Sequence, residues 1–431
     1  MLTIPSTLLS SFEKYTTGLH TLLADSRVQH RDPRLIAALD GEPSRKLRES
    51  VHGSLLRESG TFFTGREISS RLLEGLSGVR TVGAVDPACG AGDLLIAVAR
   101  KLPIESTFER TMDNWAALLV GCDVHRQFVT ASKLRIALLA LHRGATPPKS
   151  DVEVCDLLPN ITHGDGMFHK PVETPKLVIM NPPYTRVIAP DDCIWGEGLV
   201  SSAALFVSRW LDMIPKGGRL VAILPDVLRT GSNYRLWREA VLKRSKVERL
   251  RILGRFDAST DVDVFAADFV VGSHRPSEPR TWMWSKAKHR AIIGTRFAVG
   301  VGTIVPHRDR KVGELRAYLN AQAAPPWGTC MRLNARTRTK RRLFKPPFVV
   351  IRRTSSPSDP VRAIGTVVLG TRKVAVENHM LVLTPRKPTV EECRKLMRVL
   401  KSTKTTKWLN QRIRCRHLTV EAVRDIPWWS D

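Results

Sequence analysis

Four consecutive residues near the middle of the chain, Asn181-Pro182-Pro183-Tyr184, combine an amide, two rigid rings and a phenol. They follow residues 176–180, a short apolar run rich in β-branched side chains that is typical of a buried parallel strand. Proline fixes φ, lacks an N–H and pushes the preceding residue out of the helical region, so the strand must end at Asn181. Because open α/β sheets bind ligands at the carboxyl ends of their strands, this loop is the first candidate for chemistry.

A glycine turn earlier in the chain, Asp86-Pro87-Ala88-Cys89-Gly90-Ala91-Gly92-Asp93, is the second candidate. Residues 81–85 before it predict a strand, and residues 94–102 after it have helical apolar spacing. Gly90 and Gly92 let the backbone turn tightly and approach a ligand closely. Asp86 can bind an amino group, and a third spaced glycine for a pyrophosphate is absent from the turn. A nucleotide with an amino-acid tail therefore fits this turn better than NAD.

Two further acidic residues follow predicted strands. Asp123 comes after the apolar run 116–122, where a carboxylate can accept two hydrogen bonds from the cis-diol of a ribose or can cap the helix predicted for residues 126–141. Asp165 comes after the strand predicted at residues 161–163, where it can bind the exocyclic amine of an adenine or belong to an ordinary Asp-Gly turn. Taken alone, neither residue separates ligand binding from turn formation.

The segment Thr61-Phe62-Phe63-Thr64 lies upstream of the glycine turn. By itself it predicts a loop that leads into an amphipathic helix over residues 66–76, with both aromatic rings in the core. Its position just before the glycine turn gives it a second interpretation, as a loop that faces the same ligand.

Strands and helices must alternate to position these loops. Between residues 80 and 275 the sequence also predicts helices at 201–213 and 234–242 and strands at 220–224, 249–253 and 269–272. This alternation predicts a doubly wound, Rossmann-like α/β domain. The expected domain order is a helical N-terminal segment at 1–55, the α/β domain at 56–275 and a further folded domain at 276–431.

Charge is distributed unevenly along the 431 residues. The formal net charge is +27, and residues 301–431, with 28 Lys and Arg against 9 Asp and Glu, supply +19 of it. A folded basic module of this kind favours a polyanionic partner, although any single basic run can be only a solvated face. The densest run consists of Arg332, Arg336, Arg338, Lys340, Arg341, Arg342 and Lys345.

The seven cysteines are scattered and form no CxxC pair, so the sequence predicts neither a disulfide framework nor a zinc site. No signal-peptide pattern and no apolar run long enough to span a bilayer are present in these 431 residues. We therefore expect a protein of the reducing cytoplasm that is without a metal and without a membrane partner.

Together these motifs resemble the S-adenosylmethionine-dependent N6-adenine DNA methyltransferases, whose signature is (D/N/S)PP(Y/F). Thr61-Phe62-Phe63-Thr64 looks like the family's FFT(P) motif, and Asp86 to Gly92 is similar to its DPACGSG cofactor loop. Asp123 and Asp165 are similar to its ribose-binding and adenine-side acids. The motif order resembles the γ arrangement, which implies a methyltransferase domain followed by a DNA target-recognition domain with Arg336, Arg338, Lys340, Arg341 and Arg342 at the DNA.

The resemblance implies a chemical role for each residue of the central loop. The N6 amine of adenine is a poor nucleophile because its lone pair is delocalised into the ring. The side-chain oxygen of Asn181 and the backbone oxygen of Pro182 can accept its hydrogens, while Pro183 stiffens the loop. A base flipped out of the duplex can stack on Tyr184, and Phe265, in preference to Phe256, is expected to complete the stack.

Other interpretations of the central loop remain open. The same four residues occur in methyltransferases of guanine amines in ribosomal RNA and of protein glutamine side chains, because all of these enzymes methylate a planar amine or amide. A DNA-binding subunit that keeps the fold without turnover is a third possibility. The adenine-specific enzyme is preferred, because residues 61–64 lie upstream and a large basic domain lies downstream. A restriction-modification system, with a separate restriction or defence subunit, is its expected setting.

Overall fold

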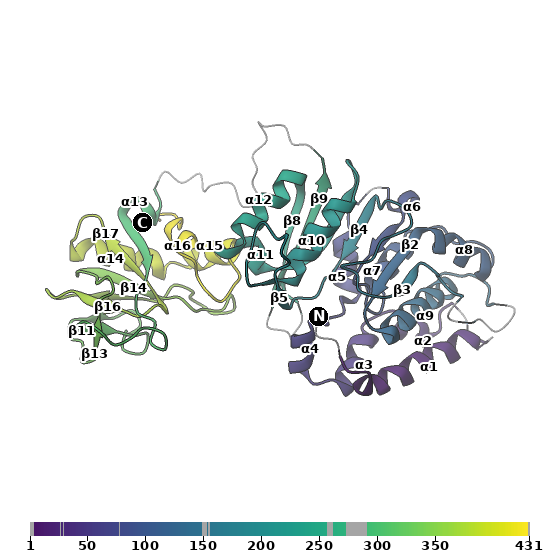
Figure 1. Ribbon diagram of the computed structural model, residues 1–431, viewed down its shortest axis with the longest axis horizontal. Coiled ribbons are helices and arrows are strands. Elements are labelled where there is room, and N and C mark those ends of the chain that lie inside the picture. The colour runs from purple at the N-terminus through teal and green to yellow at the C-terminus, as the bar shows by residue number, and fades with distance from the viewer. Residues whose placement is uncertain are drawn as a thin grey trace. The chain divides into compact units, whose positions relative to one another are not determined.

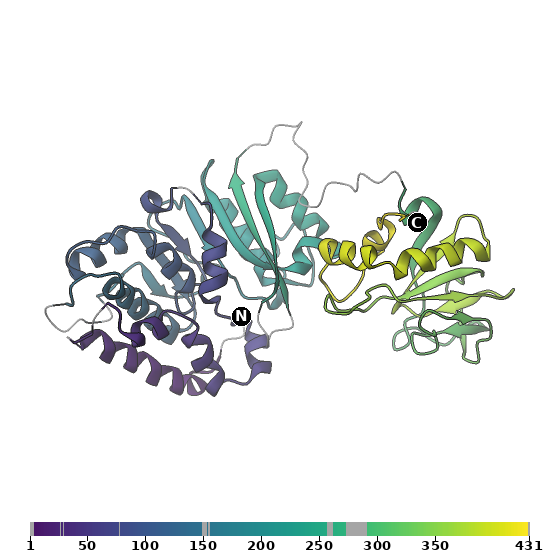
Figure 2. The same cartoon turned by 180° about the vertical axis from the view of Figure 1, so that it is seen from behind.

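The computed structural model describes residues 4–429 apart from Ser26, Gln29, Ser77 and residues 149–152, 154–155, 257–261 and 273–290. The chain forms two compact units (Figures 1 and 2). The first comprises Met1–Arg229 and Asn233–Trp282, and the second comprises Met283–Asp431 with Thr230–Ser232.

A seven-stranded mixed sheet with strand order β3-β2-β1-β4-β7-β9-β8 is the centre of the first unit. The five strands from β3 to β7 are parallel, and β9 runs antiparallel to both β7 and β8. The prediction of a doubly wound α/β fold is therefore confirmed. The strands are β1 (Ala84–Asp86), β2 (Leu119–Asp123), β3 (Ile161–His163), β4 (Leu177–Met180), β7 (Arg219–Pro225), β8 (Ser245–Arg255) and β9 (Asp263–Val271).

Helices lie on both sides of this sheet (Figure 1). All four residues of β4 are buried, which is why the strand is a continuous apolar run without polar alternation. The flanking helices are α5 (Gly65–Leu73), α7 (Asp93–Ala99), α8 (Phe108–Leu118), α9 (Arg126–His142), α10 (Ser202–Met213), α11 (Asp226–Thr230) and α12 (Arg235–Arg244).

The N-terminal helices share the core of the first unit. Helices α1 and α2 contact α9 directly and lie beside it in Figure 1. Buried side chains of α1, including Phe12 and Leu19, belong to the same hydrophobic cluster as Phe128 and Leu134 of α9. The helices are α1 (Ser10–Ala24), α2 (Pro33–Ala38), α3 (Glu42–Ser50) and α4 (Gly53–Ser59).

Strand boundaries differ from the sequence predictions in several places. The run 116–122 becomes a strand only from Leu119, because residues 116–118 end α8, and the predicted strand 249–253 is the middle of β8. The predicted strand 81–85 begins only at Ala84, because residues 79–82 form the short helix α6 and Gly83 turns the chain with φ +62°. The predicted strand 269–272 is only the end of β9. Its earlier part contains Asp268, a buried carboxylate paired with Arg219 and Arg249, and this charge interrupts the apolar pattern.

The second unit contains two sheets and three C-terminal helices. A five-stranded sheet has the order β10-β17-β14-β15-β12, and a three-stranded sheet has the order β13-β11-β16. Helix α14 (Val390–Lys401) packs on β14 and β15 and closes the core of this unit, with α15 (Thr403–Arg412) and α16 (Val420–Arg424) following. The strands are β10 (Phe297–Val301), β11 (Glu314–Leu319), β12 (Thr329–Cys330), β13 (Arg336–Thr339), β14 (Phe348–Arg352), β15 (Gly365–Val368), β16 (Val374–Val376) and β17 (Met380–Pro385).

None of the helices described here is both long and apolar enough to cross a membrane.

Candidate functional site

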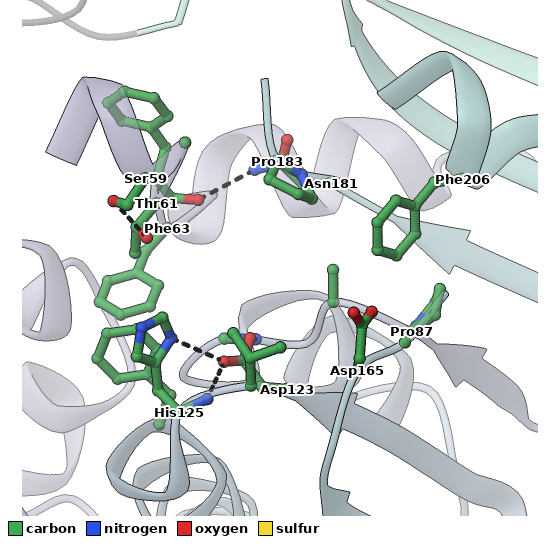
Figure 3. A pocket seen from close by; sticks show the side chains of 17 residues that line it. Ser59, Thr61, Phe63, Pro87, Asp123, His125, Asp165, Asn181, Pro183 and Phe206 are labelled. Atoms are coloured by element: carbon green, nitrogen blue, oxygen red, sulfur yellow. Dashed lines mark hydrogen bonds and ion pairs between the residues drawn. The ribbon is translucent and has the colours of Figure 1, made fainter. Parts of the chain in front are cut away.

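A cleft of about 560 Å³ opens where the parallel strands of the first unit end (Figure 3). The turns after β1, β2, β3 and β4 all contribute to its wall, as the rule for open α/β sheets predicts. Its lining residues are Ser59, Gly60, Thr61, Phe62, Phe63, Pro87, Ala88, Gly90, Asp123, Val124, His125, Phe128, Asp165, Gly166, Asn181, Pro183 and Phe206.

The glycine turn needs its glycines for steric reasons. Gly90 and Gly92 have φ values of +51° and +86°, in the left-handed region that side chains with a Cβ disfavour. A Cβ on Gly92 would lie 2.4 Å from Oγ of Ser132, and one on Gly90 would press on the ring of Phe63 at 3.0 Å. The turn is therefore packed closely on its neighbours and presents backbone to the cleft.

Asp86 is the most perturbed carboxyl group at the site. Its side chain is 1% exposed and accepts a hydrogen bond from the Ala88 N–H at 3.1 Å. Its pKa is raised to about 8, mainly by burial and also by the negative charges of Asp123 and Asp93, while the hydrogen bond from Ala88 acts in the opposite direction. Asp86 lines a smaller cavity of about 240 Å³ that shares Phe62, Phe63, Ala88, Gly90 and Asn181 with the main cleft. A cationic ligand in this cavity would strongly stabilise the ionised form of the buried carboxyl group.

Asp123 and Asp165 face the cleft and hold their own turns at the same time (Figure 3). Oδ2 of Asp123 accepts from the Gly90 N–H at 2.9 Å, and Oδ1 accepts from the N–H and from Nδ1 of His125 at 2.9 and 3.2 Å. Oδ1 of Asp165 accepts from the Met167 N–H at 2.9 Å. Each of these two carboxylates can therefore hold its own turn and still face a ligand in the cleft.

Asn181 is fixed at both ends of its side chain. Its Nδ2 donates to the backbone oxygen of Phe62 at 3.2 Å and to Oγ1 of Thr64 at 3.1 Å. Its Oδ1 accepts from the hydroxyl of Tyr184 at 2.7 Å. Because Asn181 lines both cavities, residues 61–64 serve the site by orienting the amide as well as by closing the cleft.

Three aromatic rings gather around the central loop. The ring of Tyr184 lies 6.3 Å from that of Phe62 and 6.2 Å from that of Phe256, to which it is nearly perpendicular. Phe256 and Phe62 are 6.0 Å apart. Phe265, by contrast, lies inside β9 between β7 and β8, with a side chain that is 0% exposed.

Several cleft residues gave no signal in the sequence. His125 follows Asp123 by two residues and could have been noticed only for its proximity to that acid. Phe128 of α9 and Phe206 of α10 also line the cleft. An aromatic residue in an apolar helix is predicted to belong to the hydrophobic core, so neither was noticed. Among the residues that the structure describes, no cluster of three or more His, Cys, Asp or Glu side chains could hold a metal ion.

The five basic residues expected at DNA are exposed in the second unit. Arg336 and Arg338 project from one face of β13, an edge strand of the three-stranded sheet, because alternate residues of a strand share a face. Lys340, Arg341 and Arg342 follow in the next turn, where Nη2 of Arg341 is paired with Oδ1 of Asp309 at 2.6 Å.

Residues 53–249 match the model of the N-6 DNA methylase family. The type II methyltransferase M.BanIII of Aneurinibacillus aneurinilyticus is 27% identical over 139 residues, which are 30% of this chain and 23% of that protein. The type II restriction enzyme and methyltransferase RM.BcgI of Heyndrickxia coagulans is 26% identical over 200 residues, 46% of this chain and 29% of that protein. The matches thus span less than a third of either relative.

Solved structures with a similar chain path include the type IIL restriction-modification enzyme MmeI in complex with DNA. It is 12% identical with a TM-score of 0.47, over 84% of this chain and 64% of that one. The type IIG restriction endonuclease BpuSI is 13% identical with a TM-score of 0.42, over 89% and 61%. A protein from Listeria monocytogenes described as a class I S-adenosylmethionine-dependent methyltransferase is 14% identical with a TM-score of 0.39, over 64% of this chain and 91% of that one.

Proposed function

Because residues 53–249 belong to the N-6 DNA methylase family, we propose that the protein transfers a methyl group from S-adenosylmethionine to the N6 amine of adenine in a specific duplex DNA sequence. One observation carries this proposal: Asn181 and Pro183 border the same cleft as Asp123 and Asp165. A nucleotide held by the acids would therefore lie beside the loop that can hold an amine.

The residues of the cleft fit this cofactor. Asp86, beside the smaller cavity, would bind the α-ammonium group, Asp123 the ribose hydroxyls and Asp165 the adenine amine. Bound S-adenosylmethionine would supply an activated methyl group on a sulfonium centre. The backbone and side chains that would enclose it are those of Thr61, Phe62, Thr64, Ala88, Gly90 and Gly92.

The central loop would favour the attacking form of the amine. Oδ1 of Asn181 already accepts from Tyr184, and an amide oxygen has a second lone pair for an N6 hydrogen. The backbone oxygen of Pro182 would accept the other hydrogen as positive charge builds on nitrogen. Since both acceptors are held before the substrate arrives, little reorganisation is needed during the reaction, a contribution of a few kcal/mol per partner.

Phe256, rather than Phe265, is the residue we propose to complete the stack on the flipped base. It is 5% exposed and lies beside Tyr184, whereas Phe265 is 0% exposed and would have to leave the interior of the sheet to reach a base. Phe256→Ala should lower methyl transfer by roughly tenfold or more, since stacking contributes about 1–3 kcal/mol per base. With 2-aminopurine at the target position, fluorescence should report weaker flipping. Phe265→Ala should instead lower the melting temperature, and equal flipping by the Phe256→Ala variant and the wild type would contradict the assignment.

Residues 276–431 are proposed to form the target-recognition domain, with β13 and the turn after it at the DNA. The double variant Arg336→Gln, Arg338→Gln should bind DNA more weakly at every sequence and reduce the slope of log affinity against log salt by about 2, at roughly 0.9 per phosphate contact. Arg341→Gln is the matched control: its charge is paired with Asp309, so its effect on the slope should be smaller. Titrations of labelled duplex at several salt concentrations measure both, and an unchanged slope in the double variant would exclude β13 from the interface.

A restriction-modification system is the proposed setting, supported by the names of both curated relatives. A separate restriction or defence subunit would then be a partner, and the cytoplasm, where the DNA lies, would be the compartment.

Sequencing of modified bases in DNA from cells that express the chain tests the proposal. N6-methyladenine should appear at one short sequence and disappear with Asn181→Ala. Absence of this mark, together with new methylation of ribosomal RNA guanine or protein glutamine, would favour the other amine methyltransferases. Absence of all methylation, with tight salt-dependent DNA binding, would favour a non-catalytic subunit.

A further inference from the structure

We infer that the N-terminal segment, residues 4–52, is a working part of the cofactor site and that His125 is the positioning residue that connects it to Asp123. This segment precedes the stretch that the family model matches, and the sequence alone assigned no chemistry to it. The inference rests on the proposed function, because it names Asp123 as the group that binds the ribose.

The hydrogen bonds of His125 determine its tautomer. Its Nε2 accepts from the backbone N–H of Ile4 at 3.0 Å, so this nitrogen carries no proton. The proton must therefore lie on Nδ1, which donates to Oδ1 of Asp123 at 3.2 Å. The ring is 7% exposed and lies 4.6 Å from the ring of Phe128, which limits its rotation. The beginning of the chain thus selects the form of His125 that donates to Asp123.

Asp123 is held by three donors as a result. The N–H of Gly90 donates to Oδ2 of Asp123. The backbone N–H and the imidazole Nδ1–H of His125 both donate to Oδ1 (Figure 3). Both lone pairs of Oδ1 are then engaged, and Oδ2 keeps one lone pair in a fixed direction for a hydroxyl of the ribose diol. That hydroxyl meets an acceptor that is already oriented, which reduces the reorganisation needed on binding.

Two further contacts join the N-terminal segment to the same cleft. Phe12 of α1 lies 6.0 Å from Phe63, whose ring covers Gly90, and 5.0 Å from Phe128. The buried guanidinium of Arg135 donates to the Ala38 oxygen of α2 at 2.7 Å and also to the Ala91 oxygen of the glycine turn. Docking of the segment and order in the cofactor site are therefore linked, and by thermodynamic linkage each must stabilise the other.

Two substitutions at His125 separate positioning from packing. His125→Leu keeps the bulk and removes both ring nitrogens. His125→Asn keeps an N–H donor at the position of Nδ1 and gives up the bond to Ile4. Affinity would be measured by calorimetry on the full chain with S-adenosylhomocysteine and with its 2′,3′-dideoxy analogue, and circular dichroism would verify folding.

The wild type should bind the ribose diol ligand more tightly than the dideoxy analogue. His125→Leu should weaken binding of the diol ligand about tenfold and leave the analogue nearly unchanged, because a hydrogen bond to a charged group contributes about 1.5–3 kcal/mol. His125→Asn should restore most of the discrimination. An equal loss for both ligands, or no rescue by asparagine, would show that His125 is only a packing residue and would overturn the inference.

The contribution of the segment itself is tested at Ile4. Ile4→Pro removes the N–H donor, and Ile4→Ala removes the buried side chain but keeps the donor. Ile4→Pro should reduce discrimination between the two ligands severalfold more than Ile4→Ala, and equal behaviour would refute the link to the N-terminus. A wild-type protein that binds neither S-adenosylmethionine nor S-adenosylhomocysteine would overturn the proposed function as well, whereas tight wild-type binding with unaffected variants would overturn this inference alone.

Discussion

Asn181→Ala should lower the rate of methyl transfer by at least about a hundredfold, because loss of one preorganised acceptor at a developing charge has an effect of this size. Cofactor affinity should change little, since Asp86, Asp123 and Asp165 would carry most of the contacts to the cofactor. Single-turnover transfer from labelled S-adenosylmethionine measures the first quantity, and calorimetry measures the second. The contrast between the two is the signature of a residue that acts on the amine.

Thr64 supplies a control for this result. Its Oγ1 accepts from Nδ2 of Asn181, so Thr64→Val should leave the amide present but less well oriented, with a smaller loss than Asn181→Ala. Thr64→Ser keeps the acceptor and should stay close to the wild type. Wild-type turnover by Asn181→Ala, or equal losses in both Thr64 variants, would contradict the role given to the loop.

Asp86→Asn should abolish tight cofactor binding, since the amide cannot pair with an ammonium group. The affinity of the wild type should rise with pH up to about 8, because burial raises the pKa of Asp86 to about 8 and only the ionised carboxylate pairs with the cation. Near pH 7 binding should therefore release a proton, which calorimetry in buffers of different ionisation enthalpy detects. An affinity independent of pH, with no proton release, would mean that Asp86 is not the partner of the ammonium group.

The raised pKa of Asp86 also affects stability: cofactor affinity should rise with pH, but the free energy of unfolding of the cofactor-free protein should fall. In the cofactor-free folded state Asp86 stays protonated up to about pH 8, whereas in the unfolded chain it ionises near its ordinary value of about 4. Between these values the unfolded state binds fewer protons, so the free energy of unfolding falls as pH rises. Asp86→Asn removes this contribution, and its melting temperature should exceed that of the wild type increasingly toward pH 8. Melting temperatures of the wild type and of Asp86→Asn that change with pH in the same way would contradict this prediction.

Local rules account for the parts of the site that the sequence could predict. Proline chemistry ends β4 at Asn181, and the glycines that follow Asp86 must turn the chain after β1, so both loops had to lie at one edge of a parallel sheet. These restrictions act between neighbours in the chain. They place Asp123 after β2 for the same reason.

Long-range packing determines the parts of the site that could not be predicted from the sequence. The bond from Ile4 to His125 joins residues 121 positions apart, and no local pattern marks either of them. Phe256 and Phe265 are both aromatic residues near the last two strands, and only the pairing of β9 between β7 and β8 shows that Phe265 points into the core. Gly83 is required by its φ of +62° and by the Leu118 carbonyl, 2.1 Å from where its Cβ would lie.

Transfer of isotopically labelled methyl from S-adenosylmethionine to duplex DNA, followed by mass spectrometry of the nucleosides, tests whether the protein methylates the N6 amine of adenine. We expect label in N6-methyldeoxyadenosine, dependent on Asn181 and confined to one sequence. Label found only in ribosomal RNA or in protein glutamine, or no transfer by a protein that binds both cofactor and DNA, would contradict it.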